Sequence, residues 1–194
     1  GIAAAGFTSV ELTSVPGWTE HLLRDSTDQD LAGVQALLDK YGLSVVSISG
    51  HSDLVSDAGV AEFRKAINLA RKLGVDKITT STGGHDASSA GSLEDQRAAF
   101  MKNIGPLADE AAEHGIDICL ETHGGLLATG EISKKLIQDI GRSNIGINYD
   151  PGNVIFYGAV LPEGDLPGAV DTVTHMHVKD SIGGPGVWNF PQVG

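Results

Sequence analysis

Acidic and histidine side chains recur at the ends of short apolar segments in this sequence. Glu121, Asp150 and His177 each stand at or near the end of such a segment, and the three segments follow one another along the chain. Successive side chains of a strand alternate between its faces, and a carboxylate facing covering helices would lose water without gaining a partner. We therefore expect Glu121, Asp150 and His177 to point inward and converge. Two carboxylates and one imidazole suit a divalent cation such as Mn²⁺, Mg²⁺, Co²⁺ or Zn²⁺.

Each of these residues also has a simpler interpretation. Glu121 could be a solvated loop residue, and Asp150, which is followed by Pro-Gly, suits the first position of a type II turn. In the pair His175 and His177, one imidazole could simply bond the backbone. We expect His177 to be the ligand because it lies nearer the strand end, with His175 deeper behind it. The joint pattern at three successive strand ends favours the metal site.

Four other polar residues stay open between a site and a structural role. Glu11 interrupts an apolar segment, where it would be either the buried partner of a base or part of the site. Lys179 would either pair with a carboxylate or contact a substrate. His51 and His85 are single histidines in predicted loops, for which no functional role is the simpler interpretation.

Glycines mark the junctions of a repeating pattern that positions these residues. Glycine accounts for 26 of the 194 residues, and Gly42, Gly74 and Gly115 each end a helical pattern and precede a β-rich segment. Glycine is typical of a helix C-cap, because this position takes a positive φ, which costs glycine little. Apolar residues at i, i+3 and i+4 spacing predict four helices, at 30–41, 61–73, 93–114 and 132–140. Short β-branched segments predict six strands, at 9–12, 44–49, 77–80, 116–121, 145–149 and 173–178.

Strands that alternate with helices indicate an α/β protein with a parallel sheet. An open doubly wound sheet would carry a glycine-rich nucleotide fingerprint, and the nearest approach, Thr82-Gly83-Gly84-His85, does not fit it. We therefore predict a (β/α)8 TIM barrel. A complete barrel needs about 250 residues, so we expect residues 1–194 to form a single barrel domain truncated at both ends, with strands two to seven present and the first and eighth missing. A longer native chain would complete its open edges, which we expect, or a homo-oligomer would cover them.

The composition excludes several classes of protein. The 13 basic and 25 acidic residues give a net charge of −12, which argues against a nucleic-acid partner. A single cysteine excludes an internal disulfide framework and cysteine-based zinc cages. No apolar run reaches the ~20 residues that a membrane span needs, and the start of the chain lacks the features of a signal peptide. We therefore expect a cytoplasmic protein with no membrane partner.

Three segments of the chain resemble the xylose-isomerase-like TIM-barrel superfamily, which includes sugar phosphate isomerases and epimerases, inosose dehydratase and endonuclease IV. The segments are Leu120-Glu121-Thr122-His123-Gly124, Asn148-Tyr149-Asp150-Pro151-Gly152-Asn153 and His175-Met176-His177-Val178-Lys179-Asp180. The resemblance implies metal ligands at Glu121, Asp150 and His177, and a fourth ligand, a glutamate, on the eighth strand that we expect to be missing. Asn153 and Leu127 depart from the ketose 3-epimerases, which carry histidine and glutamate at these places. The charge of −12 argues against endonuclease chemistry.

The resemblance implies a divalent-metal-dependent isomerase or epimerase that acts on a sugar or sugar phosphate through an enediolate intermediate. The metal would chelate a carbonyl and an adjacent hydroxyl, and Glu121 or the missing glutamate would be the catalytic base. The candidates to bind the sugar or polyol substrate are His51, His123, Lys179 and His175. A metal-dependent dehydratase similar to inosose dehydratase, and a non-catalytic barrel that binds a polyol, are the alternatives.

Overall fold

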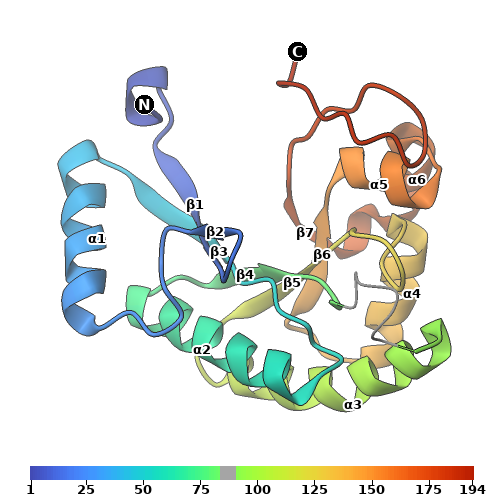
Figure 1. Cartoon of the computed structure of the whole chain (residues 1–194), viewed down its shortest axis with the longest axis horizontal. Helices are drawn as coiled ribbons and strands as arrows, with labels where there is room; N and C mark the ends of the chain where they lie inside the picture. The colour runs from blue at the N-terminus through green and yellow to red at the C-terminus, as the bar shows by residue number, and fades with distance from the viewer. Residues whose placement is uncertain (84–90) are drawn as a thin grey trace.

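Seven strands form one sheet in the computed structural model, which describes residues 1–83 and 91–194 (Figure 1). In spatial order they are β2 (Thr19–Glu20), β1 (Ser9–Val15), β3 (Ser44–Ser49), β4 (Lys77–Thr80), β5 (Asp117–Glu121), β6 (Ile145–Tyr149) and β7 (Val173–Met176). The short β2 pairs antiparallel with β1, and all other neighbours are parallel. The six strands predicted from the sequence are all present and pair in chain order. His85 lies outside the described residues.

Four long helices follow the outside of the sheet (Figure 1). They are α1 (Asp28–Tyr41), α2 (Asp57–Leu73), α3 (Leu93–Ala112) and α4 (Gly130–Ile140), close to the four predicted ranges. The sequence patterns did not predict the short helices α5 (Pro151–Gly158) and α6 (Pro162–Ala169), nor β2, because these segments are too short for a periodic apolar stripe. No helix in the described part of the chain combines the length and the apolar character that crossing a membrane requires.

The ends of the helices carry the signals that fix where each helix begins and stops. Ser92 and Asp95 form a capping box at the start of α3, in which each side chain accepts a hydrogen bond from the backbone N–H of the other. Gly42 and Gly74 end α1 and α2 with φ values of 61° and 65°, in the left-handed region that favours glycine. The prediction is confirmed for Gly42 and Gly74, whereas the C-cap of α3 is Glu113 and Gly115 follows it with a φ of 67°.

Apolar side chains fill the layer between the sheet and the helices, but α1 contributes less than its pattern predicts. Leu37 and Tyr41 fit the apolar i, i+3 and i+4 spacing that predicts this helix, yet they are 57% and 55% exposed. Within α1 only Leu31 and Leu38 are buried. The large side chains at the centre of the layer come from the other elements and include Ile48, Phe63, Ile67, Ile78, Phe100, Ile104 and Ile118.

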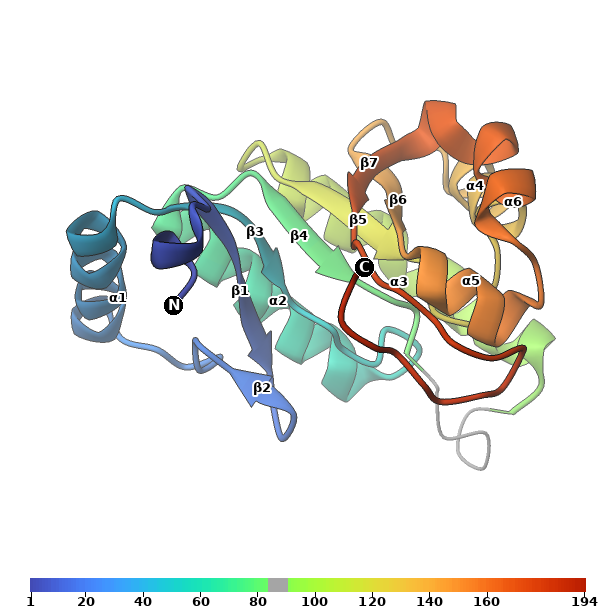
Figure 2. The same ribbon diagram turned by 90° about the horizontal axis from the view of Figure 1, so that it is seen from above.

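The sheet has two ends, and they matter for the site. One end of the strand order is β1 with its partner β2, and the other is β7. Figure 2 shows the same strands from above. Because the strands from β1 and β3 to β7 are parallel, their C-terminal ends share one edge of the sheet. The loops at that edge carry the predicted site.

Candidate metal centre

The C-terminal ends of three neighbouring strands place the three predicted ligands. Glu121 is the last residue of β5, Asp150 directly follows β6, and His177 directly follows β7. All five residues of β6 are buried, so the strand is held rigidly up to the residue that precedes the carboxylate. Because the three residues stand at the ends of neighbouring parallel strands, the fold brings them to a common point.

Asp150 has a local structural role in addition to its place in the cluster. Its side chain caps α5 by accepting a hydrogen bond from the backbone N–H of Asn153 over 2.9 Å. Pro151 occupies the start of the helix, and Gly152 does not adopt the positive φ that a type II turn requires. The turn considered as the simpler interpretation of Asp150 is therefore wrong, because the chain enters a helix at this point.

The ligand atoms of Glu121, Asp150 and His177 all lie within 4.8 Å of one another. Nδ1 of His177 is 3.4 Å from Oε1 of Glu121 and 4.0 Å from Oδ2 of Asp150. Both carboxylates are buried, with exposed fractions of 5% for Glu121 and 2% for Asp150. Two buried carboxylates beside one imidazole are a donor set that suits a divalent cation of the Mg²⁺, Mn²⁺ or Zn²⁺ type.

Burial and neighbouring charges shift the pKa values of all three groups. Burial alone would raise the pKa of Glu121, but hydrogen bonds from His177 and His51 outweigh it and hold this pKa well below its ordinary value. Burial raises the pKa of Asp150, and the Glu121 carboxylate adds to the rise. Burial would lower the pKa of His177, but the carboxylates of Glu11 and Glu121 raise it to about 10. The buried carboxylates thus require a positive charge beside them, and a divalent cation supplies that charge to the same oxygen atoms.

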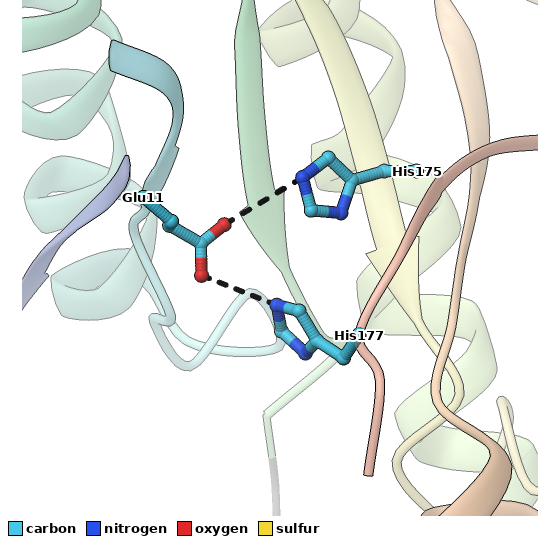
Figure 3. A group of neighbouring side chains, drawn as sticks. All are labelled: Glu11, His175 and His177. Atoms are coloured by element: carbon cyan, nitrogen blue, oxygen red, sulfur yellow. Dashed lines mark hydrogen bonds and ion pairs between the residues drawn. The ribbon is translucent and has the colours of Figure 1, made fainter. Parts of the chain in front are cut away.

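Glu11 reaches the cluster from the opposite end of the sheet. Its Oε1 lies 3.1 Å from Nε2 of His177, and its Oε2 lies 3.9 Å from Nε2 of His175 (Figure 3). Ser47 donates a hydrogen bond to Oε2 of Glu11 over 2.6 Å. Of the two roles left open for Glu11, the structure favours that of a carboxylate that pairs with a histidine.

Of the predicted substrate-binding residues His51 and His123, His51 contacts Glu121 and His123 lies beside His51. Nε2 of His51 is 2.8 Å from Oε2 of Glu121. The ring of His123 is centred 5.9 Å from that of His51 and 5.0 Å from that of Tyr157. Tyr157 had no signal in the sequence, because it lies in the unpredicted helix α5.

Lys179 pairs with a carboxylate, which is one of the two roles considered for it, and its contact with a substrate stays a prediction. Its Nζ lies 3.6 Å from Oδ2 of Asp150 and donates a hydrogen bond to Oδ1 of Asn153 over 2.7 Å. The same ammonium stands over the ring of Phe190, 3.9 Å from its centre. Asn153 in turn donates to Oε1 of Glu121 over 2.9 Å. Asn153 was noted in the sequence only as a departure from the ketose 3-epimerases, and the structure gives it a direct contact with the cluster.

The side chain of His175 is 14% exposed and that of His177 is 27% exposed, which agrees with the deeper place expected for His175. Its Nδ1 is 3.0 Å from Oδ1 of Asn148, and its Nε2 is 3.1 Å from Oγ of Ser47. Both ring nitrogens of His175 thus have protein neighbours. Asn148 also contacts His177, with its Nδ2 3.3 Å from Nδ1.

A cavity of about 540 Å³ opens onto these groups. Its lining holds three carboxylates, two imidazoles and one ammonium among a few apolar side chains: Glu11, Val46, Glu121, Asp150, His175, Met176, His177, Val178 and Lys179. The volume is that of a small-molecule site. The arrangement can hold a cation, keep a carboxylate ionised for proton transfer and surround a small polar molecule with hydrogen-bonding groups.

Comparison with protein families agrees with this architecture. The family model described as xylose isomerase-like TIM barrel matches residues 2–190. A search of curated proteins finds no significant match.

Solved structures share the fold at low sequence identity. A xylose isomerase domain protein from Planctomyces limnophilus is 24% identical, with a TM-score of 0.76 over 95% of this chain and 69% of its own. D-psicose 3-epimerase from Clostridium cellulolyticum H10, solved with D-tagatose, is 16% identical, with a TM-score of 0.74 over 91% of this chain and 64% of its own. A xylose isomerase-like TIM barrel protein from Mycobacterium smegmatis, in complex with magnesium, is 19% identical, with a TM-score of 0.73. The match covers 92% of this chain and 63% of that protein. This chain therefore spans about two thirds of the length of these structures, and the likeness shows a shared fold.

Proposed function

The chain belongs to the xylose isomerase-like TIM barrel family, and on this premise we propose that it is a divalent-metal-dependent isomerase or epimerase of a sugar or sugar phosphate. The observation that carries the proposal is the convergence of Glu121, Asp150 and His177 within 4.8 Å of one another at the C-terminal edge of the sheet. In TIM barrels this edge is where active sites are built. A relative of the same fold was solved with D-tagatose, and another with magnesium, which supports this choice of substrate class and cofactor.

The donor set of the cluster fits the cofactor. Glu121, Asp150 and His177 would hold the cation through two carboxylate oxygens and Nδ1 of the imidazole. When bound, a divalent cation acts as a Lewis acid that stabilises negative charge on substrate oxygen atoms. The cavity of about 540 Å³ beside the cluster has room for a monosaccharide-sized molecule.

Glu121 is the proposed catalytic base. Its lowered pKa keeps the carboxylate ionised at neutral pH, as a group that accepts a proton from carbon must be. His51 holds Oε2 and Asn153 holds Oε1, so the carboxylate has a fixed orientation towards the cavity. Protonation of the neighbouring carbon gives isomerisation. Protonation of the same carbon from its opposite face gives epimerisation and needs a second acid there, a role that suits the glutamate expected on the eighth strand.

His51, His123 and Lys179 are the proposed substrate-binding groups at the rim. Imidazole nitrogens and an ammonium are donors to sugar hydroxyls, and the ammonium also suits a phosphate. His175 lines the floor of the cavity, where its contacts with Asn148 and Ser47 hold it in place. In this proposal His175 contacts the far end of the substrate.

The test combines metal binding with turnover. The chain is titrated with Mn²⁺ by calorimetry and then assayed by NMR on ketoses, aldoses and inososes. We expect one bound cation and interconversion of a sugar pair, and both should be lost in Glu121→Gln and His177→Asn but kept in the control Glu113→Gln, an exposed carboxylate at the end of α3. Cation binding with sugar binding but no turnover would favour the non-catalytic barrel, and loss of water from an inosose would favour the dehydratase.

A further inference from the structure

The contact that joins the residues farthest apart in the sequence connects the two ends of the sheet. Glu11 lies on β1 and His177 follows β7, and 166 positions separate them in the sequence. Oε1 of Glu11 and Nε2 of His177 are nevertheless 3.1 Å apart (Figure 3). In the described residues β1 and β7 are at opposite ends of the strand order, so side chains rather than backbone hydrogen bonds connect them here.

The two nitrogens of His177 face different carboxylates. Nδ1 faces the carboxylates of Glu121 and Asp150, at 3.4 and 4.0 Å, whereas Nε2 faces Glu11. A neutral imidazole has one N–H and one lone pair, and only the lone pair can bind a metal. A carboxylate that accepts a hydrogen bond from Nε2–H therefore leaves the lone pair on Nδ1, on the side of Glu121 and Asp150.

We propose that Glu11 is a positioning residue, which holds the Nε2–H of His177 so that Nδ1 is presented to a cation between Glu121 and Asp150. This inference rests on the proposed function, because it assigns a role towards the same cation. Carboxylates that accept from the remote N–H of a metal-binding histidine fix the ring orientation and make the ligand more basic.

The local structure of β1 and β3 fixes Glu11 for this role. Val10 pairs with Val45 and Glu11 pairs with Ser47, so Val46 is an extra residue that interrupts the ladder. A shift of one residue turns a strand's side chains to the other face. The irregularity therefore places Ser47 directly opposite Glu11, where its hydroxyl donates to Oε2 over 2.6 Å. Oε1 is left for His177.

The same region offers a competing arrangement that an experiment must separate. The ligand atoms of Glu11, His175 and His177 also lie within 4.8 Å of one another, so these three could themselves hold a cation. Such a cation would use Nε2 of His177 and would make Glu11 a ligand. The hydrogen bonds that already engage Glu11 with Ser47 and His175 with Asn148 favour the positioning role.

The test measures cation affinity and stoichiometry rather than turnover. Mn²⁺ and Co²⁺ are titrated calorimetrically into the unaltered chain, Glu11→Gln, Glu11→Ala and the control Glu113→Gln, with the Co²⁺ absorption spectrum as a second readout. We expect one cation in every variant, with affinity about 10- to 100-fold lower in Glu11→Ala. Glu11→Gln should lie between, because its amide oxygen can still accept from Nε2–H. The control should match the unaltered chain.

Three results would overturn the inference, and they differ from one another. Unchanged affinity in both Glu11 variants would remove the positioning role and leave the proposed function standing. Loss of one of two bound cations in Glu11→Ala would show that Glu11 is a ligand of a second site. No cation binding by the unaltered chain would overturn the proposed function together with this inference. Ser47→Ala serves as a milder variant that frees Glu11 without altering it, and it should weaken binding less than Glu11→Ala.

Discussion

The side-chain amide of Asn153 donates a hydrogen bond to Oε1 of Glu121 over 2.9 Å, and both residues are buried. The other end of the same amide accepts from Nζ of Lys179 over 2.7 Å. Asn153 thus links the proposed base to the ammonium at the rim. A buried amide with both ends engaged fixes the rotation of the carboxylate that it touches.

Asn153→Leu should lower both stability and activity. Leucine has a similar volume but leaves Oε1 of Glu121 and Nζ of Lys179 each without one partner. A buried polar group that loses its partner costs about 1–3 kcal/mol, which urea unfolding measures. The exposed Asn68→Leu in α2 is the matched control and should stay within about 0.5 kcal/mol of the unaltered chain. Equal stability of the two variants would contradict the role of Asn153.

Asp150→Asn should abolish tight cation binding while leaving stability nearly unchanged. Asparagine is as good an N-cap as aspartate, so α5 keeps its hydrogen bond to the N–H of Asn153. Asp150→Ala loses the cap as well and should cost about 1 kcal/mol more. Calorimetric titration with Mn²⁺ and thermal unfolding check the two effects separately. A chain that unfolds in Asp150→Asn with its cation affinity intact would leave Asp150 only a structural role.

The thiol of Cys119 should be unreactive in the folded chain even at alkaline pH. Cys119 is buried, and burial raises its pKa from 9.0 to about 11. At pH 9 the thiolate fraction of the folded chain is therefore roughly 50-fold below that of the unfolded chain. Because the folded state holds the proton more tightly, this group's contribution to stability falls as the pH rises from 9 to 11. Iodoacetamide labelling at pH 9, with and without urea, measures the ratio, and equal rates in the two conditions would refute it.

Arg24→Lys should loosen the loop that carries His51. The buried guanidinium donates to the backbone oxygens of Glu62 and His51, at 3.1 and 3.0 Å, and to Oγ of Ser52 at 3.1 Å. One ammonium lacks the planar fork that reaches these acceptors together. We expect a loss of about 1–3 kcal/mol in unfolding free energy and a lower kcat, because His51 holds Glu121. The exposed Arg71→Lys in α2 should change neither quantity.

The sequence predicted the parts of the site that depend on local order along the chain. Glu121, Asp150 and His177 follow strands whose apolar patterns were clear, and parallel pairing of those strands is enough to bring their ends together. The capping signals at Ser92 and the junction glycines located the helices for the same reason, because they act within a few residues.

Contacts that depend on packing between distant segments could not be predicted from local sequence patterns. The partner of Glu11 could not be chosen from sequence, because it lies 166 positions away and depends on an irregularity in β3. The role of Asn153 was hidden because α5 was not predicted, and a Pro-Gly start reads equally as a turn. The exposure of Leu37 and Tyr41 could not be predicted for the same reason. Apolar spacing shows which side of a helix is apolar, but it does not show whether another element packs against that side.

The contact between Glu11 and His177 also has a consequence for the order of events in folding. The three proposed ligands lie between positions 121 and 177, while the group that orients His177 lies near the start of the chain. We expect such a long loop to close late, after the local βα units have formed. A cation would therefore bind tightly only once the two ends of the sheet have met, and it would act by slowing unfolding rather than by speeding folding. The unfolding rate in the presence of Mn²⁺ thus becomes a measure of whether β1 and β7 have come together.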